Sequence, residues 1–272
     1  MFFRVVDSPW GIGYLDFSRG KRGKRGKRGD GMRGREKGLI AVPAFNEVET
    51  IGGVVREILD EGLGCDIVVV NDGSSDDMES VLQALPVTVL SHPINLGYGA
   101  AVQTGMMYAV RHGYDFLVLM DADGQHVPSQ IGVLLEELQR GKDIVIGSRL
   151  SDDSGSYRIP FFRRAGIRLF SFLAWILGGV RIRDVTSGFQ AMRREVFTAL
   201  SQEYPVDFPD AEVIVMLGLR KFKVAEVPVI VRERQGGVSM YANLGTVLYY
   251  PFKSLLASFI VLLRLVRNRK GG

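Results

Sequence analysis

Between residues 39 and 147, short apolar runs alternate with segments of helical periodicity, and this alternation limits the fold more than any other feature. The apolar runs predict strands at 39–42, 66–70, 87–90, 115–120 and 143–147. The segments between them predict helices at 51–59, 76–85, 100–111 and 128–140. Continuous apolar strands separated by helices indicate a mainly parallel sheet that helices cover on both faces. The predicted fold class is therefore α/β.

The polar sequences that follow the strands predict where a ligand binds. PAFNE, NDGSSDD, SHPINLGYG and DADGQH each come directly after one of the first four strands. In an open parallel sheet, ligands bind beyond the carboxyl ends of the strands. Four polar, turn-prone segments at one edge therefore predict a binding site there.

Asp121 and Asp123 stand two residues apart after the fourth strand, so their side chains point to one side if the strand persists. Two carboxylates, with Gln125 as a third oxygen donor, suit Mg²⁺ or Mn²⁺ better than zinc. Magnesium completes its coordination shell with phosphate and water, so the pair implies a diphosphate ligand. The alternative is an ordinary solvated turn.

Three other segments at this edge are candidates for contacts with the same ligand. Gly97 and Gly99 allow the backbone to approach a phosphate where a helix begins, although the pattern also fits a tight turn. Asp72, Asn46 and Glu47 are able to bond a base or a ribose, and the alternative for each is a helix cap.

Six motifs together resemble the family 2 glycosyltransferases: VPAFNE, NDGSSDD, NLGYGAAVQTG, DADGQH, IGSR and DVTSGFQAMRREV. The resemblance covers about residues 39–240 and is strongest to the polyprenyl-phosphate sugar transferases, of the dolichyl-phosphate mannose synthase kind. It implies a Rossmann-like GT-A fold, a GDP- or UDP-linked sugar donor, and Mg²⁺ or Mn²⁺ as cofactor. The sugar itself is not specified by these motifs.

The resemblance also assigns roles to individual residues. The residues that it places in the nucleoside pocket are Pro43, Phe45, Glu47 and Asp72, and with Asn46, Gly97, Gly99 and Asp121 they make up the predicted nucleotide-sugar site. Those that would hold the metal against the diphosphate are Asp121, Asp123 and Gln125. Arg149 in IGSR would face the acceptor phosphate, and Arg232 or Arg234 in RERQGGVS would reach the phosphates from a mobile loop. For His126 we favour a supporting hydrogen bond over a direct role.

The nature of the acceptor decides which further residues are catalytic. A sugar hydroxyl needs a general base, for which Asp210 and Glu212 in FPDAEV are candidates. A lipid monophosphate is mostly a dianion at neutral pH, with a second pKa of about 6, and needs only cations to guide it. Arg149, Arg163 and Arg164 are candidates for that task, because guanidinium groups match phosphate geometry.

The main hypothesis is an inverting, metal-dependent transfer of mannose or glucose to a polyprenyl phosphate. Asp123 and Arg149 would take part in catalysis in that case, and Asp184 could approach the acceptor or cap a turn. The alternatives are transfer to a saccharide hydroxyl or another soluble acceptor, and a nucleotide-sugar-binding module without activity.

Charge divides the chain into unequal parts. Residues 1–38 carry a net charge of +7 and the remaining 234 residues a net −3, which gives no support to nucleic-acid binding. The triplet repeat KRGKRGKRG predicts a disordered tail, which is either solvated or attracted to anionic lipid. We therefore expect a tail over 1–38, a glycosyltransferase domain over 39–243 and an amphipathic C-terminal helix over 244–272.

Two apolar segments, 167–180 and 247–263, each contain a basic residue and fall short of the ~20 residues that span a bilayer. Aromatic residues beside arginines in the first segment suit a lipid surface, and a buried helix is the alternative. We expect a peripheral or monotopic protein on the cytoplasmic face of a membrane, with a membrane-protein partner left open. The single cysteine, Cys65, excludes an intramolecular disulfide.

Overall fold

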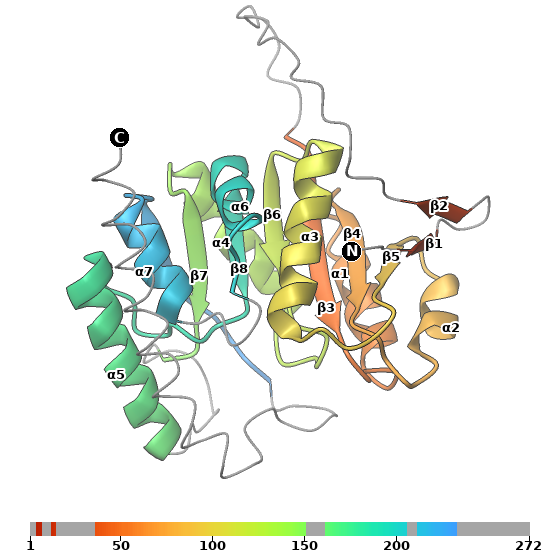
Figure 1. Cartoon of the computed structure of the whole chain (residues 1–272), viewed down its shortest axis with the longest axis horizontal. Coiled ribbons are helices and arrows are strands. Elements are labelled where there is room, and N and C mark those ends of the chain that lie inside the picture. The colour runs from red at the N-terminus through yellow and green to blue at the C-terminus, as the bar shows by residue number, and fades with distance from the viewer. Residues whose placement is uncertain (1–3, 7–11, 15–35, 151–160, 206–210, 233–272) are drawn as a thin grey trace, which may run out of the picture.

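The computed structural model describes residues 4–6, 12–14, 36–150, 161–205 and 211–232 (Figure 1). Its strands are β1 (Arg4–Val6), β2 (Ile12–Tyr14), β3 (Gly38–Ala44), β4 (Asp66–Asn71), β5 (Thr88–Ser91), β6 (Phe116–Leu119), β7 (Ile144–Ser148), β8 (Gln190–Arg193) and β9 (Val224–Pro228). Its helices are α1 (Ile51–Asp60), α2 (Met78–Gln83), α3 (Tyr98–His112), the short 3₁₀ helix η1 (Pro128–Gln130), α4 (Ile131–Gln139), α5 (Phe161–Gly178), α6 (Arg194–Leu200) and α7 (Ala211–Leu219).

The described strands form one sheet in the order β2-β1-β5-β4-β3-β6-β8-β7-β9. Strands β3, β4, β5 and β6 pair in parallel, and β7 pairs in parallel with β9. Strand β8 is antiparallel to both of its neighbours, β6 and β7, so these two run in the same direction. The predicted mainly parallel α/β sheet is therefore confirmed. The predicted strands did not include β9 or β8, which has four residues and leads directly into α6.

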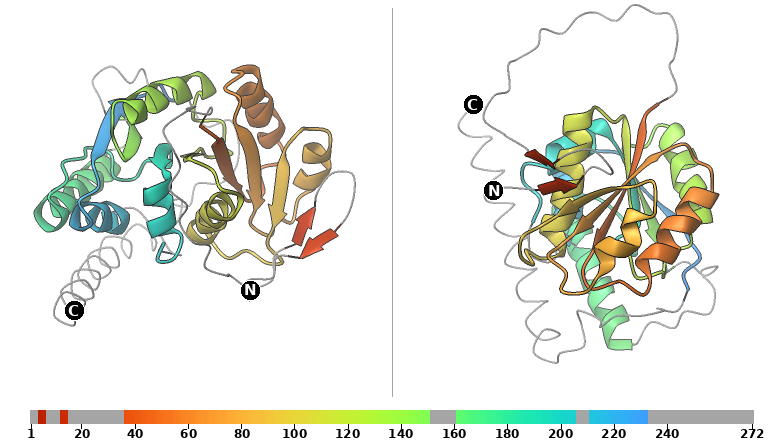
Figure 2. Two further views of the ribbon diagram at one scale, coloured as in Figure 1. Left: turned by 90° about the horizontal axis from the view of Figure 1, so that it is seen from above. Right: turned by 90° about the vertical axis from the view of Figure 1, so that its right-hand side faces the viewer.

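Helices cover both faces of the sheet, as the two views in Figure 2 show. Because side chains alternate along a strand, β3 contributes to two separate cores. Leu39 and Ala41 pack with residues of α3, α5, α6 and α7, whereas Ile40 and Val42 pack with residues of α1, α2 and α4. The sheet is therefore buried on both sides, and only its edges and strand ends are open to ligands.

The ends of α2 differ from the sequence prediction. The helix begins at Met78 with Asp77 at its N-cap, rather than at residue 76, where Ser75 would be the N-cap. Ser75 is engaged elsewhere, because its backbone N–H and its hydroxyl both donate to Asn46 Oδ1. A side chain that already binds the neighbouring loop is not available to cap this helix.

The segment 1–38, expected to be a disordered tail, contains two short strands. Strand β1 pairs antiparallel with β5 and with β2, so it extends one edge of the sheet. Val5 pairs with Leu90 in this register. The KRGKRGKRG repeat and residues 244–272 lie outside the described residues, and the proposed domain boundaries stay predictions. Among the described helices, none has the length and hydropathy needed to cross a bilayer.

Candidate active site

The loops that follow β3 and β4 are joined through Asn46. This residue has a φ of 54°, in the left-handed region that Asn tolerates better than most residues. Its backbone N–H donates to Ser74 Oγ over 3.0 Å, and its Oδ1 accepts from the N–H of Ser75 over 2.8 Å. Asn46 therefore builds the edge by fixing one loop against the other.

Two of the residues predicted to line the nucleoside pocket differ in accessibility. Pro43 is buried within β3, where it pairs with Val70. Phe45, directly after the strand, is 44% exposed and presents an aromatic ring at the carboxyl edge. Glu47 is half-buried and accepts a hydrogen bond from Thr50 Oγ1 over 3.0 Å. The exposed aromatic ring is the surface here that a planar base would use.

Asp72 holds a turn of the chain rather than presenting its carboxylate at the surface. It is buried, and its oxygens accept from the N–H groups of Leu96 and Gly97 over 2.9 and 2.8 Å. His92 Nδ1 lies 2.6 Å from Asp72 Oδ1, and His92 Nε2 lies 2.9 Å from Thr104 Oγ1. Asp72 therefore fixes the glycine turn, residues 95–97, against α3, and its contact with a nucleoside stays a prediction.

His92→Ala is expected to lower the free energy of unfolding by about 2 to 4 kcal/mol, because it removes the imidazole that contacts both the buried Asp72 carboxylate and the buried Thr104 hydroxyl. Urea denaturation measures this change. Ile94→Ala is the matched control in the same segment, since Ile94 is 64% exposed and its truncation is expected to change stability by less than about 0.5 kcal/mol. Equal stabilities for the two variants would contradict the bonding role of His92.

Asp121 lies at the end of β6 and has defined partners on both carboxylate oxygens. Tyr98 donates its hydroxyl to Oδ1 over 2.9 Å, and His126 Nε2 lies 3.3 Å from Oδ2. Burial alone would raise the pKa of Asp121, but the interactions with His126, Tyr98 and the charge of Arg149 hold that pKa below its usual range. The side chain is 29% exposed, so an ionised carboxylate faces the edge of the sheet. The supporting hydrogen bond predicted for His126 is confirmed.

Asp123 and Gln125 form the turn that follows. Gly124 has a φ of 73°, and the N–H of Gln125 donates to Asp123 Oδ1 over 3.0 Å. Among the described residues, no group of three or more His, Cys, Asp and Glu side chains is arranged to hold a metal. Two carboxylates and one amide fit a hard divalent cation that takes its remaining ligands from a phosphate and water, as Mg²⁺ does. The donor set therefore fits Mg²⁺ or Mn²⁺ bound together with a diphosphate.

Arg149, directly after β7, is paired with Asp184. Its Nε donates to Oδ2 over 2.8 Å and its Nη2 to Oδ1 over 2.9 Å, and Nη2 also lies 2.8 Å from Thr186 Oγ1. The arginine side chain is 10% exposed and the aspartate is fully buried. Burial would raise the pKa of Asp184, but the bonds from Arg149 lower it further than burial raises it. The pair therefore fixes Arg149 beside the carboxyl edge. The motif IGSR did not indicate that Asp184 is the partner of this arginine.

Arg232, one of the two arginines expected to reach the phosphates, contacts α1 in this structure. Its Nη1 donates to both carboxylate oxygens of Glu57, over 3.0 and 2.8 Å, and its backbone N–H donates to the carbonyl of Gln125. A cavity of about 70 Å³ lies between this pair and His126. The structure thus places Arg232 next to the predicted metal turn while engaging its guanidinium with Glu57.

For the remaining predicted site residues, the structure describes the position in the chain but few contacts. Gly97, with a φ of 96°, caps the start of α3, and Gly99 is buried in its first turn. Glu212 is half-buried in the first turn of α7. Arg163 and Arg164 belong to α5, but their side chains lie outside the described residues, as do Asp210 and Arg234 altogether. The sequence did not reveal that Tyr98, His92 and Asp184 are partners of site residues. The one available signal was that all three lie within the polar motifs.

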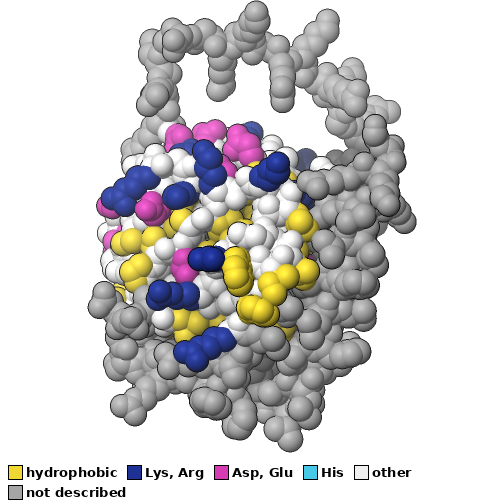
Figure 3. Space-filling view, turned by 90° about the vertical axis from the view of Figure 1, so that its left-hand side faces the viewer, with side chains coloured by type: hydrophobic (Ala, Val, Ile, Leu, Met, Phe, Trp, Pro, Cys, Tyr) yellow, Lys and Arg dark blue, Asp and Glu magenta, His cyan; other side chains and the backbone are white. Residues whose placement is uncertain are grey.

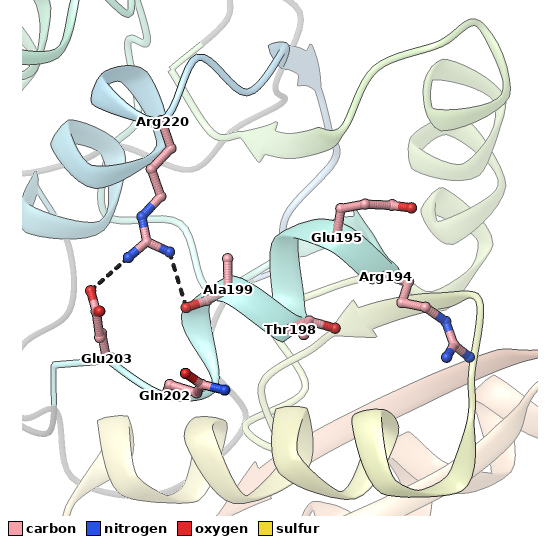
Figure 4. Close-up of a pocket in the computed structure, with 7 residues that line it drawn as sticks. All are labelled: Arg194, Glu195, Thr198, Ala199, Gln202, Glu203 and Arg220. Atoms are coloured by element: carbon pink, nitrogen blue, oxygen red, sulfur yellow. Dashed lines mark hydrogen bonds and ion pairs between the residues drawn. The ribbon is translucent and has the colours of Figure 1, made fainter. Parts of the chain in front are cut away.

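A larger cleft of about 560 Å³ lies at the opposite edge of the sheet, lined by residues of α6 and the end of α7 (Figure 4). The backbone N–H of Arg194 donates to the backbone carbonyl of Asp115, the residue directly before β6. This bond places the cleft at the amino end of that strand. Arg220 is engaged by Glu203 over 2.6 Å and by the carbonyl of Ala199 over 3.1 Å. The candidate active site is therefore the carboxyl edge, where the loops after β3, β4, β5, β6 and β7 converge.

The fold agrees with the comparisons to known proteins. A crystal structure of glucosyl-3-phosphoglycerate synthase from Mycobacterium tuberculosis, in complex with Mn²⁺, UDP-glucose and phosphoglyceric acid, superposes with a TM-score of 0.63. It is 21% identical and the match covers 84% of this chain and 80% of that chain, which shows a shared GT-A fold. The chain thus shares the fold of this synthase.

The model of glycosyl transferase family 2 matches residues 39–200, which is more than half of the chain. The chain belongs to glycosyl transferase family 2, as the motifs predict, and is an enzyme of that class. It is 32% identical over 218 residues to the polyprenol monophosphomannose synthase of Mycolicibacterium smegmatis, covering 76% of this chain and 82% of the relative. It is 27% identical over 210 residues to the UDP-N-acetylglucosamine–dolichyl-phosphate N-acetylglucosaminyltransferase of Methanococcus voltae, covering 70% and 83%.

Proposed function

We propose that this enzyme transfers a hexose from a nucleoside-diphosphate sugar to a polyprenyl phosphate, with inversion and with Mg²⁺ or Mn²⁺. The observation that carries the proposal is the position of Asp121 at the carboxyl edge, close to Asp123 and bonded to Tyr98 directly after the glycine turn that opens α3. The names of two relatives, one for mannose and one for N-acetylglucosamine, support a polyprenyl-type phosphate as acceptor. They differ in the sugar, so mannose and glucose stay the preferred candidates without being distinguished.

Each part of the edge has a task in this reaction. Asp121, Asp123 and Gln125 would hold the cation, which when bound offsets the charge that grows on the departing diphosphate. Phe45 would contact the base of the donor. A phosphate oxygen of the acceptor forms the new bond to the anomeric carbon on one face, while the bond to the donor diphosphate breaks on the other. Because the acceptor is mostly a dianion near neutral pH, no side chain has to remove a proton.

Arg149 supports the placement of the acceptor phosphate. Its bidentate pair with Asp184 holds the guanidinium in one orientation beside Asp121, whose pKa it lowers. A fixed guanidinium close to the donor site reduces the repulsion between two phosphate groups that have to approach each other. We therefore assign the acceptor phosphate to the side of the edge formed by β7.

The outer face of α5 supports attachment to a membrane surface. Phe172, Trp175 and Ile176 are 52%, 42% and 58% exposed, and the guanidinium of Arg181 lies 4.8 Å from the centre of the Trp175 ring. Figure 3, which views the molecule from the side of α5, shows apolar side chains next to lysines and arginines. Apolar groups flanked by cations suit the boundary between lipid headgroups and acyl chains. We propose a peripheral position on the cytoplasmic face, with the helix predicted at 244–272 as a second contact.

The proposal is tested by incubating the full chain with labelled UDP- and GDP-hexoses, Mn²⁺ or Mg²⁺, and a polyprenyl phosphate in detergent. Label is expected to enter the organic phase only when the cation is present, and excess EDTA is expected to abolish the transfer. The matched acceptor control is the polyprenol without its phosphate, which is expected to receive no label. Transfer to the free alcohol at a similar rate, or no transfer from any common donor, would overturn the proposal.

The same assay distinguishes a phosphate acceptor from a hydroxyl acceptor. A reaction without a general base is expected to tolerate Asp210→Asn or Glu212→Gln with a loss of less than about 10-fold, whereas loss of a general base typically costs about 100-fold or more. If either variant abolishes transfer while donor binding survives, a saccharide hydroxyl becomes the preferred acceptor.

A further inference from the structure

Gly188, two residues before β8, lies against the carboxylate of Asp121. A Cβ atom added to Gly188 would lie 2.6 Å from Asp121 Oδ2, 2.7 Å from Oδ1 and 2.6 Å from the hydroxyl oxygen of Tyr98. Atoms that are not bonded to each other do not come this close in a packed protein, so a side chain at residue 188 would displace Asp121 or Tyr98. Gly188 is not among the described residues with positive φ, so its backbone conformation does not require glycine. Glycine is required at this position because Asp121 and Tyr98 occupy the space that a side chain would need.

The pairing of β8 with β6 explains why these residues meet. Leu119 at the end of β6 pairs with Gln190 at the start of β8, and the strands are antiparallel, so the residues after one lie beside the residues before the other. Gln190 Nε2 donates to the carbonyl of Ser187 over 2.8 Å, and the N–H of Gly147 donates to the carbonyl of Phe189 over 2.9 Å. These bonds fix the backbone around residue 188.

Tyr98 and His126 complete the surroundings of the carboxylate. Tyr98 is the first residue of α3 and donates to Oδ1, whereas His126 lies against Oδ2. The ring of His126 stacks on Phe189, with centroids 4.9 Å apart and an angle of 24° between the planes. Asp121 is therefore contacted from the start of α3, from its own loop and from the segment before β8.

We propose that Tyr98 and Gly188 are positioning residues, which together fix the orientation of the Asp121 carboxylate toward a divalent cation and the donor diphosphate. This inference rests on the proposed function, in which Asp121 binds that cation. The Tyr98 hydroxyl occupies one acceptor direction of Oδ1, which leaves another for the cation. The missing side chain at residue 188 leaves the carboxylate the room to keep this orientation. Groups that orient a metal ligand typically change metal affinity about 10-fold to 100-fold when they are removed.

The test compares Tyr98→Phe with Tyr114→Phe, a matched control. Tyr114 also donates its hydroxyl to an aspartate, Asp66, over 2.7 Å, but Asp66 is the first residue of β4 and so lies at the opposite edge of the sheet. The readout is the dissociation constant of Mn²⁺, followed by the EPR signal of the free ion, in separate titrations with UDP and with GDP. Tyr98→Phe is expected to weaken Mn²⁺ binding by about 10-fold or more, and Tyr114→Phe to leave it unchanged.

A second pair of variants tests the space at residue 188. Gly188→Ala is expected to weaken Mn²⁺ binding at least as much as Tyr98→Phe does. Gly132→Ala is its control, because a Cβ atom at Gly132 in α4 meets no atom within 4 Å. Nucleotide affinity without a cation, measured by calorimetry, is expected to be the same for all four variants, which a general loss of structure would not allow. If Gly188→Ala proves too unstable to purify, the Mn²⁺ affinity of Tyr98→Phe alone decides whether the positioning role holds.

The outcomes separate this inference from the proposed function. If the wild-type chain binds Mn²⁺ with a nucleotide and Tyr98→Phe binds it equally well, the positioning role is wrong and the proposed function stands. If the wild-type chain binds no Mn²⁺ with either nucleotide, the cation has no role at this edge and both are overturned.

Discussion

Asp121→Asn and Asp123→Asn are each expected to reduce sugar transfer by about 1,000-fold, equivalent to about 4 kcal/mol of transition-state stabilisation. Asparagine keeps the shape of the side chain but removes the negative charge that a hard divalent cation requires. For Asp121 the change also alters the bonds with Tyr98 and His126. The initial rate of label transfer at saturating Mn²⁺ measures the loss, and a Mn²⁺ titration is expected to show that it is not recovered at higher concentration.

Asp115→Asn is the control for this pair of variants. Asp115 directly precedes β6 and Asp121 follows it closely, so the same strand carries a carboxylate at each end. Asp115 accepts a hydrogen bond from the N–H of Lys37 and is exposed, so its replacement is expected to leave transfer unchanged within about 2-fold. Retention of more than a tenth of the activity by the double variant Asp121→Asn/Asp123→Asn would remove the basis for a cation at this edge.

Asp184→Asn is expected to lower the free energy of unfolding by about 3 to 5 kcal/mol at neutral pH. The substitution leaves the guanidinium of Arg149, which is 10% exposed, without the charge that balances it, and breaking a buried pair on one side has a penalty of this size. Denaturation by urea, followed by circular dichroism, measures the difference. Transfer activity is expected to fall as well, because Arg149 loses its fixed orientation.

The pH dependence of the same difference tests its cause. The pKa of Asp184 is lowered in the folded chain, whereas the unfolded value is about 3.9. A carboxylate with a lowered folded pKa stabilises the protein above the unfolded pKa, and this contribution is lost as the pH falls through the folded pKa. The stability advantage of the wild type over Asp184→Asn is therefore expected to be complete at about pH 7 and to shrink below about pH 4. An advantage that stays constant down to low pH would mean that charge is not the cause.

Much of the fold follows from local patterns in the sequence. Strands β3, β4, β6 and β7 are continuous apolar runs because both of their faces are buried, and such runs are recognisable without knowledge of their neighbours. The position of the site at the carboxyl edge follows from the same pattern, because the polar segments come directly after these strands. Strands β8 and β9 are harder to recognise, since their sequences QAMR and VAEVP each contain a charged residue. Their places in the sheet are set by tertiary contacts rather than by a local pattern.

The partners of the site residues could not be predicted, because they are brought together by segments that fold back over long stretches of chain. Asp72 binds an N–H group 25 residues away, Arg149 binds a carboxylate 35 residues away, and Arg232 binds one 175 residues away. The resemblance to relatives indicated which residues lie at the edge, but not which of them hold others in place. Asp72 illustrates the difference, since its carboxylate is turned inward to the glycine turn.

The antiparallel strand β8 has a consequence for how the enzyme is made. Strands β6 and β7 precede β8 in the chain, yet they do not pair with each other, because residues 190–193 lie between them in the sheet. Until β8 pairs, β6 presents a row of unpaired N–H and C=O groups, which is the kind of exposed edge that invites pairing with another chain. The carboxylate at the end of β6 also lacks its neighbour at residue 188 until that moment. The pairing of β8 thus completes both the hydrogen bonding of β6 and the surroundings of the Asp121 carboxylate.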